Sequence, residues 1–296
     1  GGQAETLAAR ILELDGERLR FTHPLLGSAV AARQTPSQRR SLHARLAKVV
    51  PTAEERARHL ALATAEPSGE VASILDEAAG SAHDRGAPAT AAELAQQALR
   101  LTPLANVEDT RRRLLVAADR HHAAGDSARA VALLTRAREE AAPGVERAAV
   151  LVQLAAVERG PREKEALYLQ ALAEAKGDDS LEATIHLELA GLMRWGEGVE
   201  HGAAHAALAV RAASRTDDPA LKCDALARHA DWQFRAGRGL QRAEMDEARA
   251  LERSLPGGLL MDGPTGDYCH QLVWSGELEP ARRLLLELRE LFTRRN

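Results

Sequence analysis

Two histidines of this sequence stand at a spacing that metal ions use. His201 and His205 are four residues apart, so on a helix their imidazoles lie one turn from each other. A zinc site of this kind also needs a third ligand, and in hydrolases a glutamate follows the first histidine. Gly202 follows His201 instead, and no third ligand is evident. We therefore interpret the pair as part of a solvated helix face and predict no metal site.

The two cysteines do not form a chemical motif. Cys223 and Cys269 lie far apart and outside any Cys-x-x-Cys spacing, which indicates a reducing compartment without a disulfide framework. We expect each to be a small apolar side chain. No apolar run reaches the ~18 residues of a membrane span. The sequence predicts a cytoplasmic protein without a membrane partner.

No pattern of covalent or phosphate chemistry is present. Neither Gly-x-Ser-x-Gly nor Gly-x-x-x-x-Gly-Lys-Ser/Thr occurs, so a nucleophile elbow and a phosphate-binding loop are both missing. The net charge is −4, with 39 basic and 43 acidic residues, whereas a nucleic-acid grip shows a basic face. We predict that this chain is not an enzyme, holds no cofactor and does not bind nucleic acid directly.

Composition indicates which elements carry the remaining candidates. Hydrophobic residues make up 45% of the 296 residues, but aromatic residues only 3%. Alanine and leucine must therefore supply most of the packing, which favours closely packed helices over a sheet. The length exceeds that of one ordinary core, so two units or one elongated array are expected.

The first segment has its own pattern. Residues 17–22 alternate polar and apolar side chains like a short strand, and Pro24 suits the first turn of a helix. Thr35 and Gln38 form a predicted capping box around Pro36. Ser68 is a predicted N-cap for a helix over residues 71–83.

From there the chain repeats itself. Glycines that end alanine-rich helical segments recur at intervals of 39, 35, 36, 41 and 39 residues, each predicted to join the two helices of a hairpin. They are Gly86, Gly125, Gly160, Gly196, Gly237 and Gly276.

Small or apolar residues follow these glycines at fixed offsets of 5, 9 and 12. The first lets the helices of a hairpin touch, and the next two face the neighbouring hairpin. After Gly237 the pattern slips by one residue, to Ala243 and Ala250, and Gly160 and Gly196 fit poorly. The residues at the regular offsets are Ala91, Ala95 and Ala98, then Ala130, Leu134 and Ala137, then Ala281, Leu285 and Leu288.

These offsets resemble the second half of the tetratricopeptide repeat, whereas its first-half aromatics are mostly replaced here. The resemblance implies an all-α fold in which helical hairpins stack into a right-handed superhelix. It also implies that the first helix of each hairpin lines the concave face, with inward positions 13, 10, 6 and 3 residues before the turn glycine.

That rule selects a candidate groove for a ligand or partner. Four of the eleven histidines fall among the selected positions, which also include Asp76, Arg112 and Asp224. The two interpretations left open are a functional groove and plain surface. The candidate groove residues are His83, Asp119, His122, His186, Asp231, Phe234 and His270.

Five of the eight aromatic residues fall between residues 195 and 274. They either fill the core between hairpins or line a pocket in the later repeats, since large rings anchor ligands and partners. They are Trp195, Trp232, Phe234, Tyr268 and Trp274.

A second resemblance covers roughly residues 17 to 105. It rests on four runs: LRFTHPLL (19–26), PSQRRSLH (36–43), RARHL (56–60) and RGAPATAAEL (85–94). They resemble the region that follows the ATPase module in large ATP-binding regulators of the LuxR type, which share the layout of the maltose regulator. The resemblance implies a winged-helix remnant over residues 1–52, followed by tetratricopeptide-like repeats over residues 53–296.

In such regulators a P-loop ATPase precedes the repeats and a DNA-binding helix-turn-helix follows them. The resemblance therefore implies an excised middle portion, with ATP expected only for the parent protein. We expect a sensor or signal-coupling arm that binds a small effector or a protein partner. The alternative is a stand-alone scaffold that docks peptides or other repeat proteins; a P-loop upstream and a helix-turn-helix downstream in one reading frame would favour the regulator.

Overall fold

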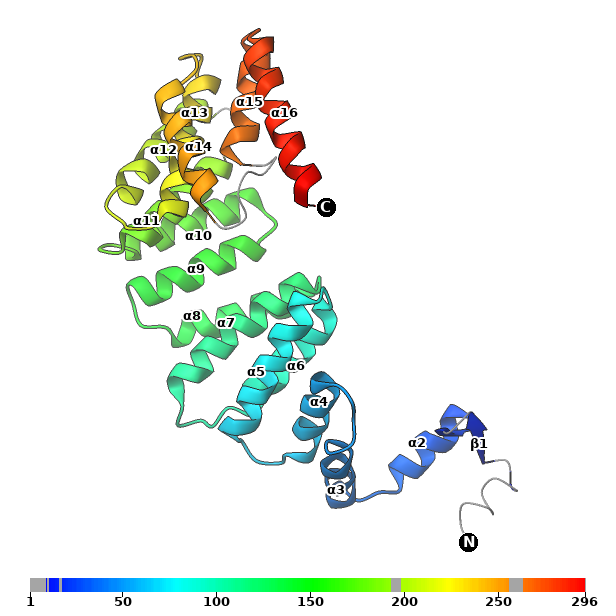
Figure 1. Ribbon diagram of the computed structural model, residues 1–296. Helices are drawn as coiled ribbons and strands as arrows, with labels where there is room; N and C mark the ends of the chain where they lie inside the picture. The colour runs from blue at the N-terminus through cyan, green and yellow to red at the C-terminus, as the bar shows by residue number, and fades with distance from the viewer. Residues whose placement is uncertain (1–8, 10, 16–17, 193–197, 256–262, 296) are drawn as a thin grey trace. The chain divides into compact units, whose positions relative to one another are not determined.

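A computed structural model describes residues 9, 11–15, 18–192, 198–255 and 263–295. The chain divides into two compact units, residues 1–133 and 134–296. In the described residues, helices are joined by short turns, and the one sheet has two strands. The all-α class is confirmed (Figure 1). No helix in these ranges combines the length and apolar character that crossing a membrane requires.

The first unit begins with a β-hairpin and two helices. Strands β1 (Leu12–Asp15) and β2 (Arg18–Phe21) pair antiparallel, and α2 (Pro24–Ala32) follows. The predicted capping box opens α3 (Pro36–Leu46): Gln38 N–H donates to Thr35 Oγ1, and Thr35 N–H donates to Gln38 Oε1. Thus the local signals over this segment are confirmed. Its assignment as a winged-helix remnant stays a prediction.

The helices of the first unit then follow in hairpins, and Ser68 caps α5 as predicted, with its hydroxyl accepting from Val71 N–H. The division between the two units falls within α8. The helices are α4 (Ala53–Ala63), α5 (Gly69–Asp84), α6 (Pro88–Arg100), α7 (Val107–Ala123) and α8 (Ser127–Glu140).

The second unit continues the same alternation. In Figure 1 the last two helices lie side by side, as the two members of a hairpin do. The helices are α9 (Val145–Val157), α10 (Pro161–Glu174), α11 (Asp179–Leu192), α12 (Val199–Ala213), α13 (Pro219–Arg235), α14 (Arg242–Ser254), α15 (Pro264–Trp274) and α16 (Leu278–Arg295).

Turn glycines end the first helix of several hairpins, as the spacing predicts. Gly86, Gly125, Gly237 and Gly276 have φ between 74° and 83°, a conformation that costs a residue with a Cβ more than it costs glycine. At Gly86 the next N–H, that of Ala87, donates to Ala82 O at 2.9 Å, which satisfies a terminal carbonyl of α5. The other three glycines show the same bond.

Two of the predicted turn glycines differ from this pattern. Gly160 has φ −75° and precedes the first residue of α10 as its N-cap, so this turn is built without the left-handed residue. Gly196 lies outside the described residues.

The regular offsets bury small residues between helices. Ala91, Ala130 and Ala281 are at most 2% exposed, so the predicted helix contact is confirmed. The slipped register after Gly237 is wrong: Ala243 and Ala250 are exposed, and Met245 and Ala248 are buried. A second glycine of positive φ, Gly239, lengthens this turn, so α14 begins later. Leu285 is also exposed, at 44%.

A tryptophan packs among the alanines of the second unit. Trp232 of α13 is 2% exposed and packs on Ala190, Ala203 and Ala206. A Cβ built on Gly202 would lie 2.5 Å from Cζ2 of the Trp232 ring. Gly202 is therefore the residue that lets α12 and α13 approach.

Candidate functional site

A groove lies among first helices of hairpins in the second unit. It has a cavity of about 330 Å³ between α11, α13 and α15. Its lining residues are Leu187, Glu188, Gly191, Asp224, Ala227, Arg228, Gly263, Pro264 and Asp267.

Small residues keep this groove open. Gly191, Ala227 and Gly263 come from the three different helices or their first turns, and each presents at most one methyl group. Pro264 opens α15 with its fixed φ, and Gly263 precedes it as the N-cap. The first turn of α15 therefore meets the middle of α13 without a long side chain between them.

Charge in the groove is mainly acidic. Glu188, Asp224 and Asp267 bring three carboxylates, and Arg228 brings the one guanidinium among the lining residues. Asp224 is exposed at the groove edge, yet desolvation of its carboxylate raises its pKa. The next effect, the charge of Arg228, lowers it, and Asp218 and Glu252 make smaller raising contributions. A cation placed beside Asp224 would relieve this cost.

Glu188 and Arg228 differ in whether another side chain of the protein already binds them. The hydroxyl of buried Tyr168 donates to Glu188 Oε2 at 3.1 Å, which orients that carboxylate from α10. Burial, followed by the Glu188 charge, raises the pKa of Tyr168, so the phenol stays a donor. Arg228, in contrast, forms no hydrogen bond or ion pair within the described part of the chain.

The residues predicted for the groove lie elsewhere. In the first unit, His83, Asp119 and His122 are exposed. In the second unit, His186 and Asp231 are each 8% exposed, Phe234 is half-buried and His270 is exposed. None of the seven lines the cavity. For the five residues that are exposed or half-buried, the interpretation as a binding surface stays a prediction.

His186 is part of a histidine pair. Its Nδ1 lies 3.0 Å from Nδ1 of His205 on the next helix, so one neutral imidazole donates to the other. Burial, and then His205, lowers the pKa of His186 to about 4. Burial also lowers the pKa of His205, with His201 as the next contribution.

This pair corrects two expectations from the sequence. His205 belongs to the contact between α11 and α12 and not to a solvated face shared with His201. His186 points at its own hairpin partner. In the described ranges, no group of three or more histidine, cysteine or acidic side chains is arranged to hold a metal ion.

Asp231 is also held inside the fold. Arg235 Nε donates to Asp231 Oδ2 at 2.7 Å, one turn along α13. Because His186 and Asp231 are both buried, treating them as surface positions is wrong. Asp231 stands six residues before Gly237, and His186 stands ten residues before Gly196. In these hairpins, side chains at those positions are buried between helices instead of facing the groove.

The aromatic residues divide between the two interpretations. Trp232 and Tyr268 are buried at 2% and 6% exposure, as core filling requires. Phe234 and Trp274 stack with ring centroids 6.3 Å apart, and Trp274 is 70% exposed. Trp195 lies outside the described residues.

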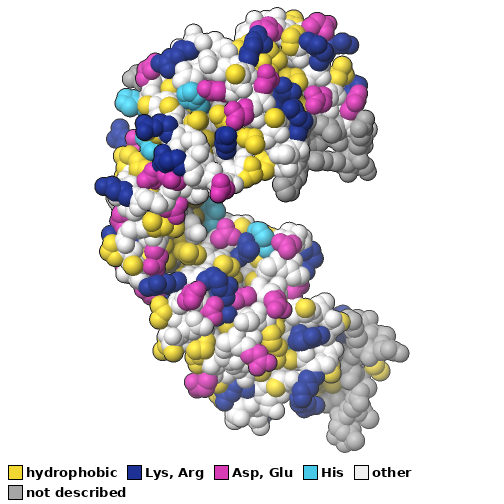
Figure 2. Space-filling view, turned by 60° about the vertical axis from the view of Figure 1, so that its left-hand side comes forward, with side chains coloured by type: hydrophobic (Ala, Val, Ile, Leu, Met, Phe, Trp, Pro, Cys, Tyr) yellow, Lys and Arg dark blue, Asp and Glu magenta, His cyan; other side chains and the backbone are white. Residues whose placement is uncertain are grey.

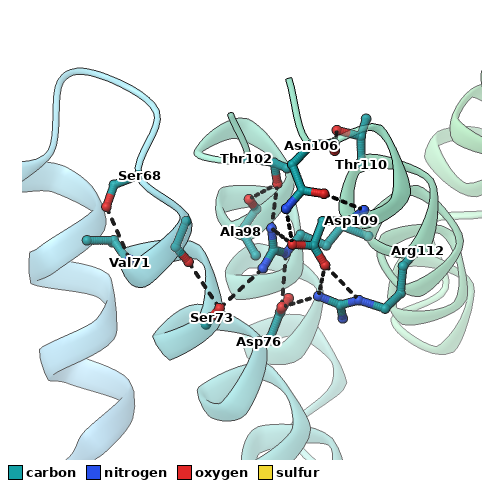
Figure 3. A network of polar contacts seen from close by, with 12 residues as sticks. Ser68, Val71, Ser73, Asp76, Ala98, Thr102, Asn106, Asp109, Thr110 and Arg112 are labelled. Carbon is teal, nitrogen blue, oxygen red and sulfur yellow. Dashed lines mark hydrogen bonds and ion pairs between the residues drawn. The ribbon is translucent and has the colours of Figure 1, made fainter. Parts of the chain in front are cut away.

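Two other inward positions, in the first unit, form an internal ion cluster (Figure 3). Arg112 Nη2 and Arg113 Nε donate to Asp76 Oδ2 at 2.8 and 2.9 Å. Arg113 is 1% exposed and also donates to Thr102 Oγ1 at 3.0 Å. Asp109 accepts from Arg112. Here the charges of α5 and α7 satisfy one another.

The sequence rule selected only part of the groove lining. Asp224, Ala227 and Gly263 stand at its 13- and 10-residue offsets. Leu187, Arg228 and Asp267 all stand nine residues before their turn glycine. A register one residue later at the second inward position would have selected them.

The face drawn in Figure 2 carries mixed charge. Figure 2 shows basic and acidic side chains interspersed with apolar ones over the face in view.

The two cysteines are buried, and burial raises the pKa of Cys223 to about 11 and also raises that of Cys269. A thiol with a raised pKa is a poor nucleophile.

Comparisons with known proteins place the fold. No protein-family model and no curated protein matches the chain. Among solved structures, the chain is similar to BtubC (BKLC) from P. vanneervenii, with 16% identity and a TM-score of 0.53 over 77% of this chain and 99% of that one. This likeness concerns the fold, which is that of all-α helical hairpin repeats, as predicted.

Two further structures are tetratricopeptide repeat proteins. YrrB, described as having an unusual peptide-binding site, aligns at 13% identity and a TM-score of 0.38 over 61% of this chain and 86% of its own. The TPR2AB domain of yeast Sti1, in complex with pHSP90, aligns at 14% identity and a TM-score of 0.25 over 77% and 93%.

Proposed function

We propose that this chain is a protein-interaction module that binds a basic peptide segment of a partner in the groove between α11, α13 and α15. The observation that carries the proposal is the acidic cavity made by three first helices. In it, Asp224 has a raised pKa, and Arg228 has no hydrogen-bond or ion-pair partner among the described residues. A lysine or arginine side chain of a ligand would pair with Asp224 and Glu188, and Arg228 would hold a backbone carbonyl.

An extended peptide suits this position better than a compact ligand. The lining comes from three successive hairpins, and an extended segment can contact side chains of all three. Repeat proteins use extended surfaces of this kind. A small effector is the second candidate, because about 330 Å³ lies at the lower end of the volumes of small-molecule sites.

We propose further that the module is the signal-coupling arm of a LuxR-type regulator. Its support is the set of sequence runs within residues 17–105. Sequencing the reading frame on both sides tests this role: a P-loop upstream and a helix-turn-helix downstream are expected. A frame without either would leave the stand-alone scaffold as the role of the module.

Selection from a library of short random peptides displayed on phage tests the groove. We expect the selected peptides to be rich in lysine and arginine. They should lose binding to a variant carrying Asp224→Asn and Glu188→Gln, in which the amide oxygen introduced at position 188 still accepts from Tyr168. The matched control is Asp217→Asn, an exposed carboxylate outside the groove.

The same selection can refute the proposal. Peptides that bind the double variant as well as they bind the original chain would place the site elsewhere. Enrichment of acidic peptides would contradict the charge argument.

A further inference from the structure

In the stacked pair of Phe234 and Trp274, Phe234 is half-buried and Trp274 is exposed. Trp274 is 70% exposed, and it stacks on Phe234. Scattered single apolar residues on a surface are ordinary, but a cluster marks a contact site. The 6.3 Å ring stacking holds α13 and α15 side chains together as one platform.

The platform lies on the same helix faces as the groove. Ala227 and Phe234 are seven residues apart on α13, and Asp267 and Trp274 are seven residues apart on α15. Seven residues make nearly two turns, so each pair shares a face and is separated by about 10 Å along the axis. His270, exposed, stands between Asp267 and Trp274 on α15.

The charged residue next to Phe234 in sequence, Arg235, interacts with other side chains of α13. Arg235 beside it is engaged by Asp231 at 2.7 Å and lies over the Trp232 ring, 6.0 Å from its centroid. The platform therefore offers ring faces, and the cation next to Phe234 on its own helix is already engaged. A flat apolar or aromatic side chain is the group that stacks on such a surface.

We propose that the partner is read at two points: a basic side chain enters the acidic groove, and an aromatic or large apolar side chain three positions away packs on Phe234 and Trp274. A segment in the polyproline II conformation advances about 3.1 Å per residue with three residues per turn, so side chains three positions apart face the same side and span roughly the ~10 Å between the two points. This inference rests on the proposed function and names the partner chemistry. The occupant is a segment in which arginine or lysine and an aromatic residue are three positions apart.

Fluorescence anisotropy with labelled synthetic peptides tests the spacing. The probes carry one arginine and one phenylalanine in a Gly-Ser background, placed one, three or six positions apart, with a fourth probe in which alanine replaces phenylalanine. We expect the three-position probe to bind best. Trp274→Ala should weaken it by about tenfold, the size of a contact at an interface hot spot, and should abolish the preference for phenylalanine over alanine.

The matched control is Leu169→Ala, which removes an exposed apolar side chain, 48% accessible, on α10. It should leave all affinities unchanged. Circular dichroism melts of both variants check folding, and since Trp274 is mostly exposed, its removal should leave the melt unchanged.

The outcomes separate the two proposals. If Asp224→Asn weakens binding but Trp274→Ala does not, the groove stands and the two-point inference is overturned. If no arginine probe binds at any spacing, the proposed function fails with it. If Trp274→Ala instead converts a dimer to a monomer in sedimentation, the platform is a contact between copies and the inference is overturned.

Discussion

The first helices of the hairpins in the two units, α5 and α7 in one and α13 and α15 in the other, carry different residues at equivalent positions. Ten residues before their turn glycines, α5 has Asp76 and α13 has Ala227. Thirteen residues before theirs, the next first helices have Arg112 in α7 and Gly263 at the start of α15. Asp76 and Arg112 meet at 2.8 Å and fill the space between α5 and α7. Ala227 and Gly263 line a cavity.

The difference shows that one position on a repeat can serve stability or binding. In the first unit, opposite charges are matched across neighbouring hairpins, so little is left for a ligand. In the second unit, small residues leave room and the surrounding carboxylates outnumber the cation. A binding site in a repeat array thus depends on small residues that leave space between the helices as well as on the charged residues at its edge.

The largest expected effect comes from breaking the cluster of the first unit. Asp76→Ala removes the carboxylate that binds Arg113, which is 1% exposed. Leaving such a charge without its main partner costs about 3–5 kcal/mol. Urea unfolding followed by circular dichroism measures this. Asp119→Ala, whose carboxylate is 62% exposed, is the control and should change stability by less than about 0.5 kcal/mol. Equal effects of the two substitutions would contradict the cluster's role.

The second effect is a loss of stability at acid pH through the His186–His205 pair. Because burial lowers the pKa of His186 to about 4, the folded state disfavours the imidazolium. Its contribution is complete above the unfolded pKa of about 6.5 and is lost as the pH falls towards 4, at most roughly 3 kcal/mol. His186→Leu should flatten this pH dependence in unfolding measurements between these values. An unchanged slope would exclude the pair as its source.

The third effect tests the packing of α12 on α13. Gly202→Ala places a methyl group where the Trp232 ring lies, 2.5 Å from Cζ2, and overpacking of this kind costs about 1–3 kcal/mol. Gly80→Ala is the control, because nothing lies within 4 Å of a Cβ there; it should be neutral or slightly stabilising. Thermal melts of the two variants compare them. A Gly202→Ala variant as stable as the original would show that the ring moves aside freely.

The smallest expected effect on stability accompanies a large effect on binding. Asp224→Asn removes a carboxylate whose raised pKa shows that the fold disfavours its charge, so at neutral pH stability should stay within about 0.5 kcal/mol or rise. Binding of an arginine peptide should fall in the same variant. In the original chain, binding should strengthen between acid and neutral pH, because the pKa of Asp224 is raised above the ordinary value of an aspartate and its carboxylate ionises over this range. Binding that is independent of pH over this range would contradict a direct contact with Asp224.

Local signals were read correctly from the sequence because their physics is local. Gly86, Gly125, Gly237 and Gly276 adopt the left-handed conformation that a helix end requires, and the Thr35 cap needs only its own turn. The regular offsets to Ala91 and Ala130 follow from one helical period. Where a second left-handed residue entered, at Gly239, the period restarted, and the predicted register of α14 failed.

By itself, the sequence determined an all-α chain of helical hairpins, their turns and most of the small residues between them, since each depends on neighbours within one or two turns. Only the tertiary structure decided which polar residues are used inside. It paired His186 with His205 and left Asp224 and Arg228 facing a cavity. Those outcomes depend on the side chain that a neighbouring helix brings to the same place, and a one-residue change in helix register exchanges a buried position for an open one.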